Sequence, residues 1–206
     1  MHEEVRHPLV QHKLALIRDA ETGHKKFREL ATEITMFLCY QALKEVRVED
    51  IDVKTPVGTA RGHRIAEDLV VVPILRAGVG MLEGLLDLAP TARVGFIGMY
   101  RDPKTKQPVS YYKRLPTETP DALCLVIDPM LATGGSAAAA ISELKEAGAK
   151  RIAMICIVTC PEGLAALAEA HPDVKVYTAS VDSHLDERKY IVPGLGDAGD
   201  RLFGTS

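Results

Sequence analysis

The feature that most constrains the fold is a short apolar run, Leu123–Ile127, which ends at an acid and a proline and leads through glycines into alanine-rich sequence. An apolar run of this length between turn residues is typical of a buried strand. The alanine-rich segment that begins at Ala137 has the composition of a helix. Strand, loop and helix in this order form the unit of a parallel sheet, so the pattern predicts an α/β fold.

The loop between this strand and helix has the residues of an anion site. The first turn of a helix leaves backbone N–H groups without partners, and the positive end of the helix dipole lies beside them. Gly134 and Gly135 have no Cβ, so their main chain can approach a phosphate closely, and Thr133 and Ser136 add hydroxyl donors. The pattern indicates a phosphate monoester as ligand, although a strand–turn–helix connection without a ligand has similar residues.

Two common phosphate-binding loops are disfavoured here. The segment has neither the Gly-Lys-Ser/Thr ending of a nucleoside triphosphate loop nor the Gly-x-Gly-x-x-Gly of a dinucleotide fold. It does have an acid, Asp128, at the carboxyl end of the strand, where open α/β sheets bind ligands. A carboxylate at that place can accept hydrogen bonds from sugar hydroxyls, so the segment is suited to a ribose 5-phosphate.

The loop resembles the phosphoribosyl-binding loop of the type I phosphoribosyltransferases, and its sequence is similar to that of the uracil phosphoribosyltransferases. The resemblance implies that every residue of the loop binds substrate and that Asp128 is catalytic. The matching residues are Asp128, Pro129, Met130, Leu131, Ala132, Thr133, Gly134, Gly135 and Ser136. Many members of the wider family have two adjacent acids here, whereas Ile127 precedes Asp128 in this chain. The second carboxylate's share of ribose and metal binding must therefore come from elsewhere.

Composition places the chain among ordinary globular proteins. Its 206 residues are 47% hydrophobic and 26% charged, and 25 basic against 28 acidic residues give a net charge of −3. We expect one domain, residues 1–206, with neither nucleic acid nor a membrane as partner. Because the N-terminus is acidic and no apolar run approaches the ~18 residues of a membrane span, we expect a cytoplasmic protein. The cysteines all lie in apolar sequence, which predicts buried reduced thiols at Cys39, Cys124, Cys156 and Cys160.

The remaining segments alternate between helix and strand patterns. Apolar residues at helical spacing predict a short helical arm within residues 7–19, a long amphipathic helix from Thr22 to about Val46, and a helix at Pro161–Ala170. Turn formers between small and polar residues predict a hairpin within residues 49–65. Apolar runs predict buried strands at 68–75, 93–100, 151–159 and 174–179. We therefore expect a central parallel sheet with helices on both faces, an N-terminal helical arm and a small C-terminal hood region.

A second strand end carries a candidate anion site. Arg76 follows the predicted strand 68–75, where it is placed either to bind an anionic ligand or to pair with a surface acid. The segment Leu75-Arg76-Ala77-Gly78 is similar to the diphosphate-binding loop of phosphoribosyltransferases. That resemblance implies that Arg76 binds substrate and is catalytic.

The polar segment from Arg101 to Arg114 is too long for a plain connector. It is consistent with a solvated hairpin or with a mobile cover over the site. We favour the cover, because Arg101 and the nearby lysines suit an anionic substrate. The family resemblance also places a flexible loop here and implies that Arg101 binds substrate.

The segment 190–201 is dense in glycine and acid. Such a tail is often a surface loop, but its glycines can also bring main-chain N–H and C=O groups against a flat ligand such as uracil. The segment is similar to the uracil-binding tail of the family. The resemblance places base contacts at Ile191, Gly196 and Ala198, and it places Asp197, as a catalytic residue, near the ribosyl substrate.

The resemblance implies that 5-phosphoribosyl 1-diphosphate and uracil react to give UMP and diphosphate, through positioning and fixed electrostatics rather than a covalent intermediate. It further implies Mg²⁺ held mainly through the diphosphate substrate, no metal ligands from the protein, a homodimer or homotetramer, and a GTP effector. Two alternatives stay open. One is a pyrimidine-responsive RNA-binding regulator on the same fold, which the lack of a basic, aromatic-interleaved stretch disfavours. The other is a transferase that acts on a purine base.

Overall fold

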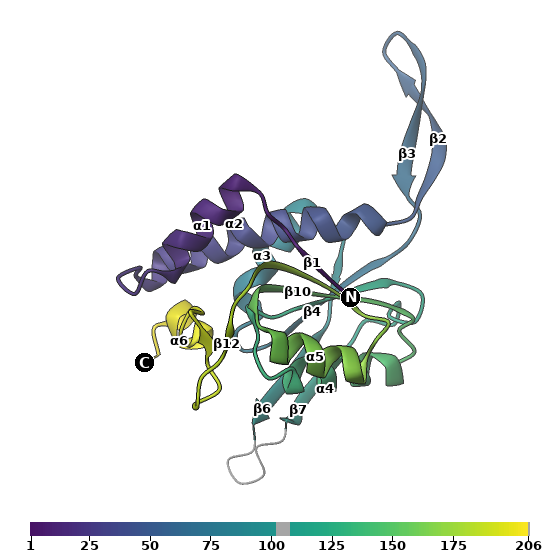
Figure 1. The fold of residues 1–206 in the computed structure, drawn as a ribbon. Helices are drawn as coiled ribbons and strands as arrows, with labels where there is room; N and C mark the ends of the chain where they lie inside the picture. Colours follow the sequence, from purple (N-terminus) through teal and green to yellow (C-terminus); the bar gives the residue numbers. More distant parts are fainter. Residues whose placement is uncertain (102–107, 206) are drawn as a thin grey trace.

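A mostly parallel sheet runs through the middle of the molecule, of which the computed structural model describes residues 1–101 and 108–205 (Figure 1). Within these residues the sheet is nine-stranded, in the order β1 (His2–Glu4), β11 (Lys175–Val181), β10 (Arg151–Thr159), β8 (Leu123–Ile127), β4 (Leu69–Leu75), β6 (Phe96–Arg101) and β7 (Pro108–Arg114), with β5 (Arg93–Val94) beside β4 and β9 (Met130–Leu131) beside β10. Every described pair in it is parallel except β6 with β7. The predicted parallel sheet is confirmed, with one antiparallel edge strand added.

Helices cover both faces of the sheet, as predicted (Figure 1). Successive residues of a strand point to opposite faces, so each buried strand contributes to two cores. Leu125 and Ile155 pack under α1 (Pro8–Arg18), α2 (His24–Ala42) and α3 (Val79–Leu88). Cys124 and Met154 pack under α4 (Gly135–Glu146) and α5 (Pro161–Ala170). The unbroken apolar runs in the sequence therefore reflect strands that are buried on both sides.

The N-terminus differs from the prediction. Residues His2–Glu4 form β1, which pairs in parallel with β11 at the edge of the sheet, whereas the sequence predicted only an arm and a helix. The strand is held by charge: Lys175 contacts Glu3 and Glu45, both at 2.9 Å. Three polar residues carry no apolar alternation, so their pairing was not predictable from local pattern. The long predicted helix is confirmed as α2, which continues into a 3₁₀ turn, η1 (Leu43–Glu45).

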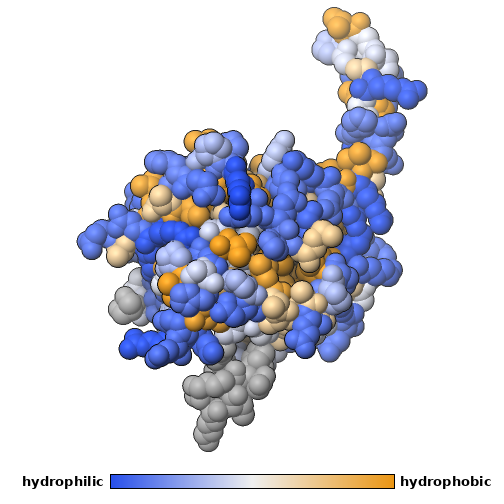
Figure 2. All heavy atoms as spheres, in the orientation of Figure 1, coloured by the Kyte–Doolittle hydropathy of each residue, from blue (hydrophilic) through white to orange (hydrophobic). Residues whose placement is uncertain are grey.

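The predicted hairpin is confirmed and forms a projecting arm. Strands β2 (Val48–Thr55) and β3 (Gly58–Ile65) pair along their whole length and extend away from the body (Figure 1). Figure 2 shows apolar side chains on this arm, exposed between charged ones. Val57, at the tip, is 98% exposed. We call residues 48–65 the hairpin arm.

The segment after β6 forms a strand in its described part. Residues 108–114 form strand β7, antiparallel to β6, so the hairpin alternative holds for the part of this segment that is described. Tyr111 explains the pairing, because its ring lies over Gly98, where an added Cβ would come within 2.6 Å of it. The predicted mobile cover, from Arg101 to Arg114, includes residues 102–107, which lie outside the described residues, as does the side chain of Arg101, so the cover stays a prediction.

The C-terminal hood region consists of short elements beside the carboxyl edge of the sheet (Figure 1). Strands β12 (His184–Leu185) and β13 (Ile191–Val192) pair antiparallel, and α6 (Ala198–Phe203) follows. None of the helices in the described residues has the length and apolar character to cross a membrane.

The four cysteines are free and buried, as predicted. Burial raises the pKa of the Cys39 and Cys156 thiols to about 12 and that of Cys124 to about 11. These thiols therefore stay protonated at neutral pH, and a protonated thiol is a poor nucleophile.

A core substitution tests this packing. Leu125→Ala removes a fully buried side chain from β8, next to the site, and leaves a cavity. We expect a loss of about 2–5 kcal/mol in the free energy of unfolding, measured by urea denaturation. Val57→Ala, at the exposed tip of the hairpin arm, is the control and is expected to change stability by less than ~0.5 kcal/mol. Equal effects of the two substitutions would contradict the assigned core.

Candidate functional site

The candidate site lies at the carboxyl edge of the sheet, where the segments after β4, β8 and β11 begin. β4 and β8 are neighbours, with Pro73 opposite Ile127, so Arg76 and Asp128 follow adjacent strands. Gly78 lets the two segments touch, because a Cβ there would lie 2.4 Å from the carbonyl oxygen of Ile127. The fold thus brings the two predicted anion-binding segments together, at the edge where open α/β sheets bind ligands.

The glycine loop, residues 128–136, is held from beneath by the end of β10. Two amides of β10 donate to the carbonyl oxygen of Pro129, at 3.0 and 3.1 Å. The Thr159 hydroxyl donates to the carbonyl oxygen of Leu131 at 2.9 Å, and the Cys160 thiol contacts that of Ala132 at 3.4 Å. These contacts satisfy the carbonyl groups of the loop on the side of the protein body.

Two glycines set how closely the loop packs. Gly163 of α5 lies under it, where an added Cβ would be 2.3 Å from the carbonyl oxygen of Leu131 and 2.5 Å from that of Ala132. Gly134 is the N-cap of α4 and has a φ of 77°, a conformation that glycine adopts without strain. No side chain caps α4, and Ser136 stands in its first turn. The first turn of α4 therefore has no side-chain cap, which is the arrangement that the predicted anion site requires.

Asp128 stands at the head of the glycine loop and is half-buried. Its Oδ1 is 3.5 Å from the amide nitrogen of Met130, a weak contact for a carboxylate. Burial raises the pKa of Asp128 to about 7, and the Met130 amide lowers it by a smaller amount. A carboxyl group with so few partners has lone pairs available for the hydroxyl groups of a ligand.

The tail, residues 190–201, is folded beside these loops. Asp197 caps α6 by accepting the amide of Asp200 at 3.0 Å. Arg76 reaches the same turn, with Nη2 3.6 Å from Asp200 Oδ1, and its side chain is 61% exposed. Gly199 lies next to it, since an added Cβ would be in ordinary contact with Arg76 Nη2, at 3.7 Å. Arg76 therefore lies beside the tail, with its charge open to solvent.

A cavity of about 230 Å³ joins the glycine loop to the tail. It is lined by Met130, Ala132, Arg188, Lys189, Tyr190, Ile191 and Asp197. Four of these residues were predicted from the sequence, and they come from segments about sixty residues apart along the chain. The structure therefore brings the predicted loop and the predicted tail to one place.

Three of the lining residues, Arg188, Lys189 and Tyr190, were not among the predicted site residues. They form the turn between β12 and β13, in which Lys189 has a φ of 70°. In the sequence they stand out only by where they lie: Arg188 and Lys189 directly precede the glycine-rich tail, and Tyr190 begins it. Cationic side chains in such a turn look like an ordinary solvated surface, so the pattern alone did not single them out.

The other predicted residues differ in what they offer a ligand. Pro129, Leu131, Ile191 and Ala198 are buried, so their side chains support the site from within. Thr133, Gly135 and Ser136 are half-buried along the loop, while Gly196 and Asp197 are exposed. The main chain of Gly196, with a φ of 72°, has no hydrogen-bond partner among the described residues.

A larger groove, of about 730 Å³, lies between the N-terminal segment and α2. It is lined by Phe37, Tyr40 and Leu88 among others and includes none of the predicted site residues. We assign the site to the smaller cavity, because the glycine loop and the tail meet there and the exposed residue Asp197 lies in its wall. Volume alone does not identify a phosphate site.

The acidic side chains of the site decide what kind of metal ion it could hold. In residues 1–101 and 108–205 no group of three or more His, Cys, Asp or Glu side chains converges. Asp128 and Asp197 can offer single carboxylate oxygens, which suits Mg²⁺ bound mostly through ligand oxygens and water. The residues therefore fit an ion that arrives with an anionic substrate rather than one caged by the protein.

Comparison with known proteins matches the chain over nearly its whole length. A family model described as Uracil phosphoribosyltransferase matches residues 4–205. The uracil phosphoribosyltransferases of Roseiflexus castenholzii and Symbiobacterium thermophilum are 57% identical over 199 residues and 55% identical over 200. Each alignment covers 97% of this chain and 96% of the relative.

Solved structures agree with this match. The AQ2163 protein from Aquifex aeolicus superposes with a TM-score of 0.94 at 38% identity, over 100% of this chain and 99% of that one. A hypoxanthine-guanine phosphoribosyltransferase from Bacillus anthracis superposes with a TM-score of 0.50 at 12% identity, over 78% and 79%. The second likeness shows a shared fold alone.

The buried acid at the head of the loop generates a pH prediction. The pKa of Asp128 is about 7 in the folded protein and about 3.9 in an unfolded chain, so the folded state holds a proton that the unfolded state releases between these values. Stability from this group is therefore greatest below pH ~4 and falls as the pH rises to ~7. Asp128→Asn cannot titrate, so its stability relative to the wild type is expected to increase over this range.

Melting temperatures of both proteins from pH 4 to pH 8 measure this difference. Asp121→Asn is the matched control, because its carboxylate is 90% exposed and pairs with Lys150. If the difference in melting temperature between the Asp128→Asn protein and the wild type stays constant with pH, the pKa of Asp128 is not raised.

Proposed function

Because the chain belongs to the uracil phosphoribosyltransferase family, we propose that it transfers the 5-phosphoribosyl group of 5-phospho-α-D-ribose 1-diphosphate to uracil, giving UMP and diphosphate. The observation that carries the proposal is the cavity in which the glycine loop and the tail meet. One side of that cavity suits a phosphorylated sugar and the other a flat base. No other segment of the described chain joins these two kinds of surface.

The glycine loop binds the 5-phosphate and the ribose. The amides at the start of α4 and the hydroxyls of Thr133 and Ser136 surround the phosphate, with the helix dipole favouring its charge. Asp128, at the other end of the loop, accepts hydrogen bonds from the ribose hydroxyls. The buried side chains of Pro129 and Leu131 keep the intervening main chain in place.

Arg76 binds the diphosphate. Its guanidinium is 61% exposed and reaches the tail at Asp200, and Arg76 follows the strand next to the one that leads into the glycine loop. A planar guanidinium matches phosphate oxygens with two parallel hydrogen bonds. Arg101, at the end of β6, is proposed as a second cation for the same group. Mg²⁺, when bound with the diphosphate, supplies further charge neutralisation of that leaving group.

The tail binds uracil. Its exposed Gly196 main chain offers the N–H and C=O groups that a pyrimidine edge requires, with Ile191 and Ala198 packed behind it. A purine is the other base considered, and the family match favours uracil. The RNA-binding regulator draws no support from the same comparisons.

Catalysis on this scheme is electrostatic. Positive charge develops on the ribose as the diphosphate leaves, and fixed carboxylates beside the ring stabilise it. Asp128 is one of them. We propose Asp197 as the second, which compensates for the missing adjacent acid at Ile127, because it lines the cavity in which the glycine loop and the tail meet. Bound uracil is then held in line with the anomeric carbon, so positioning supplies much of the rate.

We propose that the protein assembles as a homodimer or larger homo-oligomer through the hairpin arm. Cross-strand pairs lie on one face, so the register places Ile51, Val53, Ala60 and Gly62 together on one side of the arm. This apolar face projects from the body without cover, and Val53 is 42% exposed. An isolated two-stranded hairpin is marginal in water, so a second copy is the proposed cover. The GTP effector, the single domain and the cytoplasmic location stay predictions.

Steady-state kinetics test the catalytic assignments. Asp128→Asn is expected to lower turnover about 10²-fold or more, since it removes one fixed charge from the reaction centre. Arg76→Ala is expected to raise the KM for the diphosphate substrate with little change in the KM for uracil. Arg93→Ala is the control, because that side chain pairs with Asp68 and Glu118 at the far edge of the sheet. Near-normal kinetics of the first two variants would remove both residues from the site.

The mass in solution tests the assembly. Val53→Lys places a charge on the apolar face of the hairpin arm and is expected to shift the protein from dimer or larger to monomer in light scattering after size exclusion. Thr59→Lys, on the opposite face of the same arm, is expected to leave the mass unchanged. A monomeric wild type, or an unchanged mass for Val53→Lys, would contradict the role of the arm.

A further inference from the structure

We propose that Arg18 and Asp182 are positioning residues for the base: a buried ion pair outside the cavity that fixes the main chain of the tail and so sets the affinity for uracil. This inference rests on the proposed function. Neither residue was singled out from the sequence, and neither lines the cavity. They come from α1 and from the end of β11, so only the folded chain brings them together.

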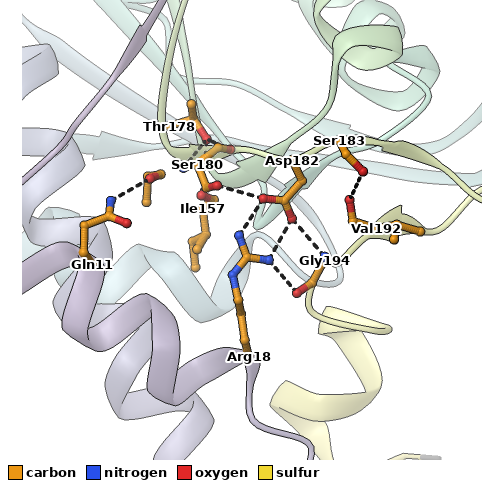
Figure 3. A network of polar contacts seen from close by, with 10 residues as sticks. Gln11, Arg18, Ile157, Thr178, Ser180, Asp182, Ser183, Val192 and Gly194 are labelled. Carbon is orange, nitrogen blue, oxygen red and sulfur yellow. Dashed lines mark hydrogen bonds and ion pairs between the residues drawn. The ribbon is translucent and has the colours of Figure 1, made fainter.

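The pair is bidentate and enclosed (Figure 3). Arg18 Nη1 donates to Asp182 Oδ2 at 2.7 Å, and Nη2 donates to Oδ1 at 2.5 Å. The Asp182 side chain is 2% exposed and that of Arg18 is 21% exposed. Ser180 Oγ also donates to Asp182 Oδ1, at 2.7 Å. Two parallel charge-assisted bonds hold both side chains in one orientation.

Both members of the pair also bind the same residue of the tail. The Gly194 amide donates to Asp182 Oδ2 at 2.9 Å, and Arg18 Nη1 donates to the Gly194 carbonyl oxygen at 2.8 Å (Figure 3). Gly194 has a φ of 61°, and an added Cβ would lie 2.1 Å from the carbonyl oxygen of Ile191. The ion pair therefore holds both polar groups of one residue in a turn that only glycine fits.

Neighbouring carbonyl groups of the tail are held in the same way. Ser183 donates twice to the Val192 carbonyl oxygen, through its amide and its hydroxyl, both at 3.0 Å. Arg201 Nη1 donates to the Leu195 carbonyl oxygen at 3.0 Å. Gly196, the next residue, has no such partner in the described part of the chain. The network thus immobilises the tail up to the residue that is proposed to meet the base.

The same network places the tail relative to the glycine loop. The amide of Asp182 donates to the Thr159 carbonyl oxygen at 2.7 Å, and the Thr159 hydroxyl donates to the Leu131 carbonyl oxygen at 2.9 Å. Two residues, Asp182 and Thr159, therefore connect Gly194 to the glycine loop through hydrogen bonds. Because the first of these bonds is made by main-chain atoms, a change of the Asp182 side chain leaves it and the loop in place.

Asp182 remains ionised in this setting. Burial by itself would raise the pKa of its carboxyl group, but the hydrogen bonds from Arg18, Ser180 and the Gly194 amide outweigh burial and lower it. Removal of one charge would leave the other enclosed without its partner, which is a costly arrangement. The tail would then relax away from the position that the pair maintains.

Uracil kinetics separate positioning from a purely structural role. Asp182→Asn and Arg18→Lys are expected to raise the KM for uracil about tenfold or more, the effect of losing hydrogen bonds to a charged group. The KM for 5-phosphoribosyl 1-diphosphate is expected to stay within about twofold, because the glycine loop is held by β10. Asp121→Asn, an exposed pair with Lys150, is the matched control. All assays are made below the melting temperature of each variant.

Ser180→Ala supplies a milder variant in case either charge substitution prevents folding, since it removes one bond to Asp182 and no charge. It is expected to raise the KM for uracil in the same direction by a smaller factor. Equal increases in both KM values, or a loss of stability with an unchanged KM for uracil, would overturn the inference. A wild type that does not convert uracil would overturn the proposed function instead, so the two failures are distinguishable.

Discussion

The hydrogen bonds between the end of β10 and the glycine loop are the contact on which the site depends. They satisfy the carbonyl groups of Pro129 and Leu131 on the side of the body. With its carbonyls turned inward, the loop can lead into an uncapped helix whose first amides face the ligand. Gly163 is required by the same contact, because any side chain there would push α5 away from the loop. The proposed phosphate site therefore depends on main-chain packing rather than on a charged side chain.

A second constraint on the site is the burial of two acidic residues near that loop, Asp128 and Asp182. Asp128 has little compensation from the protein and a pKa raised to about 7 by burial, whereas Asp182 is surrounded by donors and has its pKa lowered. The contrast separates two roles for a carboxylate. A group with unsatisfied lone pairs is available to a ligand, while a fully bonded one holds the main chain in place. On the proposed scheme, Asp128 binds the ligand and Asp182 supports the tail.

The hood region shows how remote segments define the cavity. Its tail is tied to α1 through Arg18 and to the end of α1 again through Arg201, which donates to the Asp19 carbonyl oxygen at 2.5 Å. Arg201 also lies over the ring of Phe27 in α2, 4.4 Å from its centroid. The C-terminal tail therefore packs against the N-terminal helices α1 and α2. The N-terminal arm thus contacts the tail that is proposed to bind the base.

The sequence by itself determined the α/β class, the long helix, the buried strands and the glycine loop, because each depends on periodicity or on glycine within a few consecutive residues. The sequence also pointed to the tail, because residues 190–201 are similar to the uracil-binding tail of the family. Only the tertiary structure decided the edge strands β1 and β7, the turn at Arg188–Tyr190, and the pairing of Arg18 with Asp182. These features join residues that are far apart in the chain, or polar residues with no local pattern. Their geometry exists only once the sheet has brought the segments together.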